Sequence, residues 1–105
     1  MNQRLATVAE RLLAAEKGTQ KIAVEVKSFT GPSDMVELER ALGQYVLYYD
    51  IMAEREPDRL LYLAIPEAVM TDVFGEPIGQ LLLRNQCARL IVFDPSQEVI
   101  LQWIA

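Results

Sequence analysis

The most constraining feature of the sequence is a strict alternation between residues 21 and 27. Isoleucine and valine occupy the even positions of this segment, whereas lysine, alanine and glutamate occupy the odd ones. Successive side chains of a strand point to opposite faces of a sheet, so the segment is predicted to be a strand with two different faces. Glu25 and Lys27 therefore project from the same face.

The segment that precedes this strand, residues 5–16, permits two interpretations. Its composition has high helix propensity, and a helical stripe is formed by Leu5, Val8, Ala9, Leu12 and Leu13. Alternatively, Gly18 takes the first central position of a two-residue type II′ turn, and the two segments pair as a β-hairpin. The hairpin register gives three opposed pairs, Glu16 with Lys21, Leu12 with Glu25, and Glu10 with Lys27.

A long helix is predicted between the break at Gly31-Pro32-Ser33 and Pro57. Ser33 or Asp34 can cap its start, and Asp34 and Glu37 have the spacing of a capping box. The helix should continue to about Arg55. Its buried stripe is predicted to comprise Leu38, Leu42, Tyr45, Tyr49 and Met52.

The second half of the sequence predicts three more strands and two short helices. The first of these strands is a continuous apolar run ended by Pro66, as expected of a central strand covered on both faces. The order predicts a single α/β domain over residues 1–105, in which helices cover a sheet. The predicted elements are strands at 60–65, 90–93 and 99–104, and helices at 67–74 and 77–86, with Gly75 between the helices.

The overall composition is that of one ordinary globular core. The chain has 105 residues, of which 51% are hydrophobic and 24% are charged. No apolar run approaches the roughly 20 residues needed to cross a bilayer. The start of the sequence also lacks a secretory signal. We therefore expect a cytoplasmic protein with no membrane span.

The residue inventory excludes several classes of site. Histidine is absent and Cys87 is the single cysteine, which excludes Ser-His and Cys-His nucleophile pairs, imidazole metal sites and multi-thiolate centres. Cys87 is interpreted as a small buried hydrophobe. No glycine-rich phosphate-binding motif is present, so no organic cofactor is predicted. The net charge of −5 argues against a protein that coats DNA, but not against an enzyme that meets DNA transiently through a divalent cation.

Glu25 and Lys27 have the chemistry of metal-assisted phosphodiester hydrolysis. A carboxylate binds a divalent cation through hard oxygen atoms, and a nearby lysine can orient water or stabilise charge on phosphate. Taken alone, the tripeptide is more often a solvated strand face. Gln44 and Tyr48 lie four residues apart on the predicted helix and share a face distinct from its stripe. Either both face the same cleft as Glu25, or Tyr48 packs in the core with Gln44 over it at the surface.

Several segments together closely resemble the XisH family, cyanobacterial proteins described as controlling factors for excision of the fdxN DNA element. The resemblance runs from about Glu10 to the end of the chain. It is carried by residues 14–17, 21–29, 31–33, 41–45, 62–66, 93–95 and 98–104. It implies a restriction-endonuclease-like fold of the PD-(D/E)xK type, with a core of a helix, a three-stranded meander, a helix and a strand. It also implies a strand at residues 12–16.

The resemblance further implies a set of site residues. Glu25 and Lys27 match the (D/E)xK element, and Gln44 and Tyr48 match the QxxxY element of related nucleases, so these four are the implied catalytic residues. Glu25 is the implied ligand of Mg²⁺ or Mn²⁺, and the hairpin register adds Glu10 as the only nearby carboxylate on the same face. Family members carry an upstream aspartate as the first metal ligand, whereas the matching position here falls near Ala6. A site built mainly on Glu25 is expected to hold the ion weakly.

Two functions remain open on this basis. The first is a nuclease-like protein that acts on DNA, either active with a start upstream of Met1 or inactive because the first ligand is absent. The second is a non-catalytic partner of XisI, which the resemblance implies because the two proteins are commonly encoded together. Absence of the family's first helix should also expose apolar surface near residues 42–49, which favours self-association or a partner.

Overall fold

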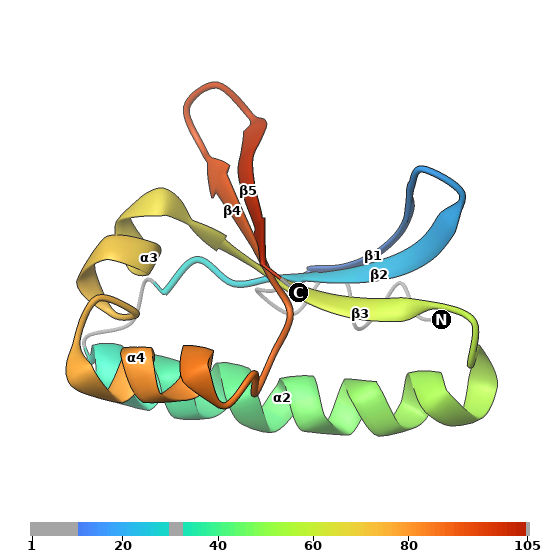
Figure 1. The fold of residues 1–105 in the computed structure, drawn as a ribbon, viewed down its shortest axis with the longest axis horizontal. Coiled ribbons are helices and arrows are strands. Elements are labelled where there is room, and N and C mark those ends of the chain that lie inside the picture. Colours follow the sequence, from blue (N-terminus) through green and yellow to red (C-terminus); the bar gives the residue numbers. More distant parts are fainter. Residues whose placement is uncertain (1–10, 30–32, 105) are drawn as a thin grey trace.

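The computed structural model describes residues 11–29 and 33–104, which form five strands and three helices (Figure 1). This architecture confirms the predicted α/β class. None of the described helices combines the length and apolar character needed to span a membrane. The elements in chain order are β1 (Arg11–Lys17), β2 (Gln20–Val26), α2 (Asp34–Arg55), β3 (Leu60–Pro66), α3 (Glu67–Asp72), α4 (Pro77–Arg84), β4 (Leu90–Asp94) and β5 (Val99–Ile104).

The five described strands form one mixed sheet in the order β1-β2-β3-β4-β5. The three inner strands are parallel, and an antiparallel hairpin partner flanks them at each edge. Parallel neighbours need crossover connections, which α2 provides between β2 and β3, and α3 with α4 between β3 and β4. Figure 1 shows these helices on one side of the sheet, where the strand that α2 mainly contacts is β3.

The hairpin of β1 and β2 follows the register predicted from its turn. Glu16 pairs with Lys21 and Leu12 with Glu25, which confirms the strand at residues 12–16 and shows that the propensity-based helix is wrong there. Gly18 has φ 64, the left-handed value that a type II′ turn requires at its first central position. Pairing with β2 therefore overrides the local helix propensity of β1. Glu10, the predicted partner of Lys27, lies outside the described residues, so this third pair stays a prediction.

The start of α2 is capped by Ser33, which settles the choice left open by the sequence. The Ser33 Oγ accepts a hydrogen bond from the Val36 backbone N–H at 3.3 Å, as expected of an N-cap residue. Asp34 is the first residue inside the helix, so the capping box of Asp34 and Glu37 is wrong. The Glu37 carboxylate instead accepts a hydrogen bond from Arg40 at 3.2 Å.

The buried stripe of α2 is largely as predicted, with one error. Leu38 and Tyr45 are buried, and Leu42 and Met52 are half-buried and pack against the main core. Tyr49 is 48% exposed, because it lies at the rim of a hollow between α2 and residues 86–89 rather than over the sheet. The sequence spacing alone does not reveal that a hollow replaces core packing at Tyr49.

Both short helices end two residues before their predicted ends. After α4, Gln86 has φ 53, and the N–H groups of Gln86 and Cys87 bond to the carbonyls of Leu83 and Leu82, each at 3.1 Å. This is the Schellman arrangement that terminates a helix, here with glutamine in the position that glycine usually takes. After α3, Phe74 turns into the core and is 2% exposed.

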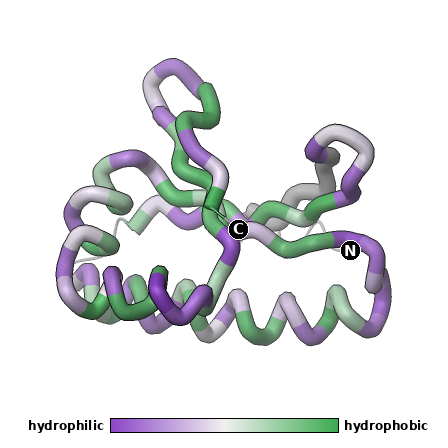
Figure 2. The backbone as a smooth tube through the Cα atoms, viewed as in Figure 1, coloured by the Kyte–Doolittle hydropathy of each residue, from purple (hydrophilic) through white to green (hydrophobic). Residues whose placement is uncertain are grey.

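The sheet separates two clusters of buried side chains. The main core lies on the helix side and includes Ala23, Leu63 and Tyr45. The second cluster lies on the opposite face around Ile22 and Tyr62. Figure 2 shows the central strands as the most continuously hydrophobic part of the tube, with hydrophilic segments at turns and helix ends. Alternation along β2 thus assigns its even residues to the second cluster and its odd residues to the side of α2.

Figure 1 shows the tips of both edge hairpins on the side of the sheet opposite α2. The Lys17 ammonium, at the end of β1, lies 4.8 Å from the centroid of the Trp103 ring on β5. The same ring meets Tyr62 edge to face, with centroids 5.3 Å apart. A cation over an aromatic ring is attracted by the ring's quadrupole, so this contact links the two edge hairpins across the sheet.

Candidate active site

Glu25 and Lys27 are both enclosed by the fold. Glu25 is 0% exposed and Lys27 is 1% exposed. The Lys27 backbone N–H donates to the Ala64 carbonyl at 2.9 Å, so the pairing of β2 with β3 continues through this residue. The two side chains therefore occupy successive odd positions on the α2 side of the sheet. The interpretation of this pair as part of a solvated strand face is therefore wrong. Burying an acid and a base is costly unless their environment compensates.

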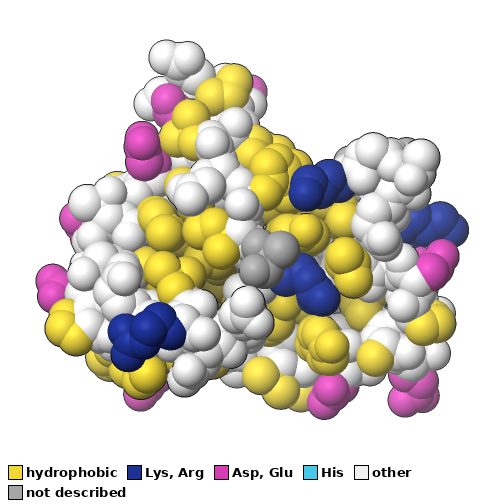
Figure 3. All heavy atoms as spheres, in the orientation of Figure 1, with side chains coloured by type: hydrophobic (Ala, Val, Ile, Leu, Met, Phe, Trp, Pro, Cys, Tyr) yellow, Lys and Arg dark blue, Asp and Glu magenta, His cyan; other side chains and the backbone are white. Residues whose placement is uncertain are grey.

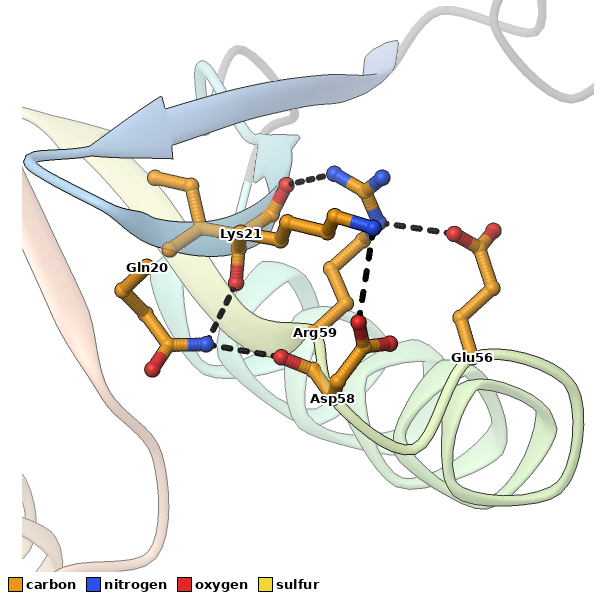
Figure 4. A network of polar contacts seen from close by, with 6 residues as sticks. Gln20, Lys21, Glu56, Asp58 and Arg59 are labelled. Carbon is orange, nitrogen blue, oxygen red and sulfur yellow. Dashed lines mark hydrogen bonds and ion pairs between the residues drawn. The ribbon is translucent and has the colours of Figure 1, made fainter.

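The position of Glu25 depends on how β2 is held against β3. Their parallel register places Glu25 beside Leu63, which is 0% exposed. Near the start of β2 and β3, the Arg59 guanidinium donates to the Ile22 carbonyl at 2.8 Å and to the Glu56 carboxylate at 2.9 Å (Figure 4). These contacts tie the loop after α2 to β2 and so maintain the register that brings Glu25 into the core.

A second set of contacts in the same network joins the hairpin to that loop. The Gln20 side-chain amide donates to the Asp58 carbonyl at 2.7 Å, and the Lys21 ammonium lies 3.4 Å from the Asp58 carboxylate (Figure 4). Lys21 is exposed, so the ion pair itself contributes little stability. Its position nevertheless distinguishes Lys21 from Lys27, the residue after β2, since Lys21 is exposed and Lys27 is enclosed.

Gln44 and Tyr48 both lie at the interface between α2 and the sheet. Each is half-buried, and Tyr48 packs against the main core, which supports the interpretation of Tyr48 as a core residue. The Gln44 Oε1 atom is buried and accepts no hydrogen bond from the described residues. A buried amide oxygen normally has a donor, so Gln44 is the polar group of this region that most needs a further partner.

Glu37 is a buried carboxylate that the sequence interpretation missed. It is 9% exposed and lies on the line of α2 that also carries Ala41, Gln44 and Tyr48, at successive spacings of four, three and four residues. That spacing was the signal available in the sequence, but the capping-box interpretation assigned Glu37 to the helix end. Together, Glu25, Lys27 and Glu37 are the buried charged residues of the described chain.

The chain leaves β2 through a turn beside a shallow hollow. Phe29 has φ 56, a left-handed conformation that is uncommon for a bulky residue, and its side chain packs against the main core. A hollow of about 180 Å³ lies here, lined by Ser28, Phe29, Asp34, Pro66, Ala68, Val69, Asp72 and Val73. It opens where the parallel strands β2 and β3 end, the region in which open α/β sheets usually bind ligands.

The described residues do not form a closed metal centre. No three histidine, cysteine, aspartate or glutamate side chains among residues 11–29 and 33–104 gather closely enough to hold an ion. Glu25 contributes one carboxylate, and Glu10, the second predicted ligand, lies outside the described residues. This donor set fits at most a cation that keeps most of its water, because Mg²⁺ bound through one carboxylate remains largely hydrated.

Another hollow lies away from these residues. It has a volume of about 370 Å³ and is lined by Tyr45, Val46, Tyr49, Gln86, Cys87, Ala88 and Arg89. Cys87 is exposed at this hollow, so its prediction as a buried hydrophobe is wrong. The reason is the left-handed turn at Gln86, which directs the following residue outward after α4 instead of into the core.

Comparison with known proteins supports the family resemblance of the sequence. The sequence profile of the XisH protein family matches residues 2–101. The chain belongs to the XisH family. A search of curated proteins finds no match.

Two solved XisH-type structures are similar to this one. The crystal structure of an XisH family protein from Nostoc punctiforme PCC 73102 has a TM-score of 0.83 and 39% sequence identity. That of an fdxN element excision controlling factor protein from Anabaena variabilis has a TM-score of 0.84 and 42% identity. In both cases the match covers 90% of this XisH chain and 74% of the other chain.

Proposed function

We propose that this XisH protein is a nuclease-like factor that acts on DNA during excision of a DNA element, with its site at Glu25 and Lys27. The observation that carries the proposal is the burial of an acid and a base two positions apart, Glu25 on β2 and Lys27 directly after it, on the side of α2. Glu and Lys side chains of a hairpin are normally exposed to solvent, since these residues are almost never fully buried without a specific reason.

The proposed fold relationship is to restriction-endonuclease-like proteins of the PD-(D/E)xK type. The order of motifs supports it, because the (D/E)xK segment lies at the end of β2 and the QxxxY segment lies on α2, the crossover helix that follows. Glu25 and Lys27 lie on the α2 side of the sheet, the side on which Tyr48 packs against the main core. In the proposed site, the Lys27 ammonium positions water or phosphate, and Gln44 with Tyr48 supports that placement.

We propose Mg²⁺ or Mn²⁺ as the cofactor, weakly held through Glu25 and, if the chain before residue 11 brings it close, through Glu10. A bound cation of this kind supplies a polarised water molecule and offsets charge on the scissile phosphate. The buried Gln44 Oε1 atom is a further hard oxygen donor on the same interface. Because the cation is held weakly, it offsets the net charge of −5 only while it is bound, so the proposed contact with DNA is transient.

The test is nicking of supercoiled DNA by the purified chain in Mg²⁺ or Mn²⁺. Glu25→Gln and Lys27→Met should each lower the nicking rate by about 100-fold or more, the usual scale for loss of a positioned acid, base or electrostatic group. Nicking that persists in both variants would show that another group, or a contaminant, cleaves the DNA.

Matched controls separate the site from net charge and folding. Glu39→Gln and Lys21→Met make the same changes of charge at exposed residues, so the nicking rate should remain within about twofold of the unchanged chain. Circular dichroism and thermal unfolding of every variant identify any loss of activity that arises from unfolding. A loss in the controls equal to that in the site variants would show that bulk charge governs the reaction.

A second candidate function is a non-catalytic partner of an XisI-like protein. It is favoured by the exposed apolar residues of α2, since Val46 is 58% and Leu47 is 62% exposed. Large exposed apolar patches mark interaction sites on soluble proteins. The exposure of these two residues and of Tyr49 agrees with the apolar surface expected near residues 42–49.

Co-purification and sedimentation with the XisI-like protein test this alternative. The complex should survive Glu25→Gln and Lys27→Met, and it should weaken by at least about tenfold in Leu47→Lys, because a lysine would place a charge in an apolar interface. Independent sedimentation of the two proteins at high concentration would exclude the partner function. Retention of the complex in Leu47→Lys would place the contact elsewhere.

A further inference from the structure

β5 is an uncharged strand whose outer edge is accessible. β5 is the last strand of the described sheet, so it pairs with β4 on one side only. Its six residues include no charged residue, no proline and no glycine. Three consecutive apolar residues on it are about half exposed: Val99 at 44%, Ile100 at 50% and Leu101 at 47%. Because neighbours in a strand point to opposite faces, the apolar surface lies on both sides of the edge.

The two edges of the sheet differ in how they are protected. Natural edge strands avoid pairing with other chains through charged residues, proline, bulges or a covering segment. The sequence of β1, at the other edge, includes Arg11, Glu16 and Lys17. Within residues 11–29 and 33–104, β5 has only one such feature, a shift of register beside Val92 and Phe93 that leaves Leu101 without a partner on β4.

The geometry of the β4–β5 hairpin makes its edge accessible and rigid. Figure 1 shows the tip of this hairpin projecting away from the helices, and Figure 3 shows hydrophobic side chains at the surface along it. The turn is fixed by the Asp94 carboxylate, which accepts from the Ser96 N–H at 2.8 Å, while the Glu98 N–H donates to the Asp94 carbonyl at 2.8 Å. A preorganised edge loses little conformational freedom when another strand adds to it.

We propose that β5 is the surface through which two copies of this chain associate, edge to edge and antiparallel, so that two five-stranded sheets become one. A second copy fits because any antiparallel register within β5 opposes only uncharged residues, so no like charges meet. Glu98, just before the strand, would lie near the far end of the partner's β5 and away from its twin. The charges that give the chain its net −5 lie outside this contact.

The proposed dimer is a weak one. A single pair of six-residue strands forms a contact below the size of standard stable interfaces, and the irregularity at Leu101 shortens the regular pairing. We therefore expect a dissociation constant in the micromolar range, with monomer predominating in dilute solution. The proposal does not depend on nuclease-like activity.

Sedimentation velocity over a concentration series tests the proposal. The unchanged chain should convert from monomer to dimer below about 300 µM, and Ile100→Lys and Leu101→Lys should each weaken association by at least about tenfold. The matched control is Leu47→Lys, which makes the same change at an exposed apolar residue on α2 and should leave association unchanged. A monomer at every concentration overturns the proposal. So does a dimer that is lost in Leu47→Lys and kept in Ile100→Lys.

Hydrogen exchange adds a readout that does not depend on sedimentation. Amide protection in β5 should rise with protein concentration in the unchanged chain and should not rise in Ile100→Lys. Full protection of all β5 amides in the dilute monomer would mean that another part of the same chain covers the edge, and would overturn the proposal.

Discussion

The hydroxyl of Tyr45 joins three separate parts of the fold, and its removal gives a measurable test of the packing described above. It donates a hydrogen bond to the Leu61 carbonyl on β3 at 3.1 Å and accepts one from the Arg89 N–H before β4 at 3.2 Å. Tyr45 is 5% exposed. Tyr45→Phe keeps the ring in the core and deletes only the atom that makes these contacts.

The expected cost follows from the two hydrogen bonds. A typical intramolecular hydrogen bond contributes about 1 kcal/mol net, and a buried group left without its partner costs at least that much. Loss of both contacts should therefore lower the free energy of unfolding by about 2 kcal/mol. For a chain of about 100 residues this corresponds to a fall in Tm of about 10 °C.

Urea and thermal unfolding measure the effect, and Tyr49→Phe is the matched control. Tyr49 lies one turn further along α2 and is 48% exposed, so water can replace any hydrogen bond that its hydroxyl makes. We expect Tyr49→Phe to change stability by less than about 0.5 kcal/mol. Equal effects of the two substitutions would refute the role assigned to the Tyr45 hydroxyl.

Three further substitutions test local features of the fold by unfolding free energy. Ser33→Ala should cost about 1 kcal/mol through loss of the hydrogen bond to the Val36 N–H, and an unchanged stability would show that another group caps α2. Gly43→Ala should stabilise by about 0.5–1 kcal/mol, because a Cβ at this helical position meets nothing within 4 Å. Gly79→Ala should destabilise by more than about 1 kcal/mol, because its Cβ would overlap the backbone of Phe74; tolerance equal to Gly43→Ala would contradict the close packing of α4.

The pattern of the sequence determines more of the sheet than of the site. Alternation at residues 21–27 correctly predicts that Glu25 and Lys27 share a face, and the turn at Gly18 correctly predicts the hairpin register. The complete burial of both side chains does not follow from that pattern, because strand alternation is the same for a solvated face and an enclosed one. Burial is decided by α2 and β3, which are distant in sequence.

Other features depend on contacts that local patterns do not encode. The two hydrogen bonds of Tyr45 join residues 16 and 44 positions away. The exposure of Cys87 depends on a left-handed glutamine, a conformation that sequence rules reserve mainly for glycine and asparagine. The propensity of residues 12–16 predicted a helix, and only the hairpin pairing and the family resemblance indicated the strand that is observed.

The most direct test of the proposed site is the double substitution Glu25→Met with Lys27→Met, assayed for both stability and DNA nicking in saturating Mn²⁺. Replacing two buried charged groups with apolar side chains of similar volume is often neutral or stabilising, so the folded state should persist with unfolding free energy lowered by no more than about 1 kcal/mol. The account predicts that this folded variant no longer nicks DNA. Nicking by the double variant at the rate of the unchanged chain, or an unchanged chain that never nicks DNA, would contradict it.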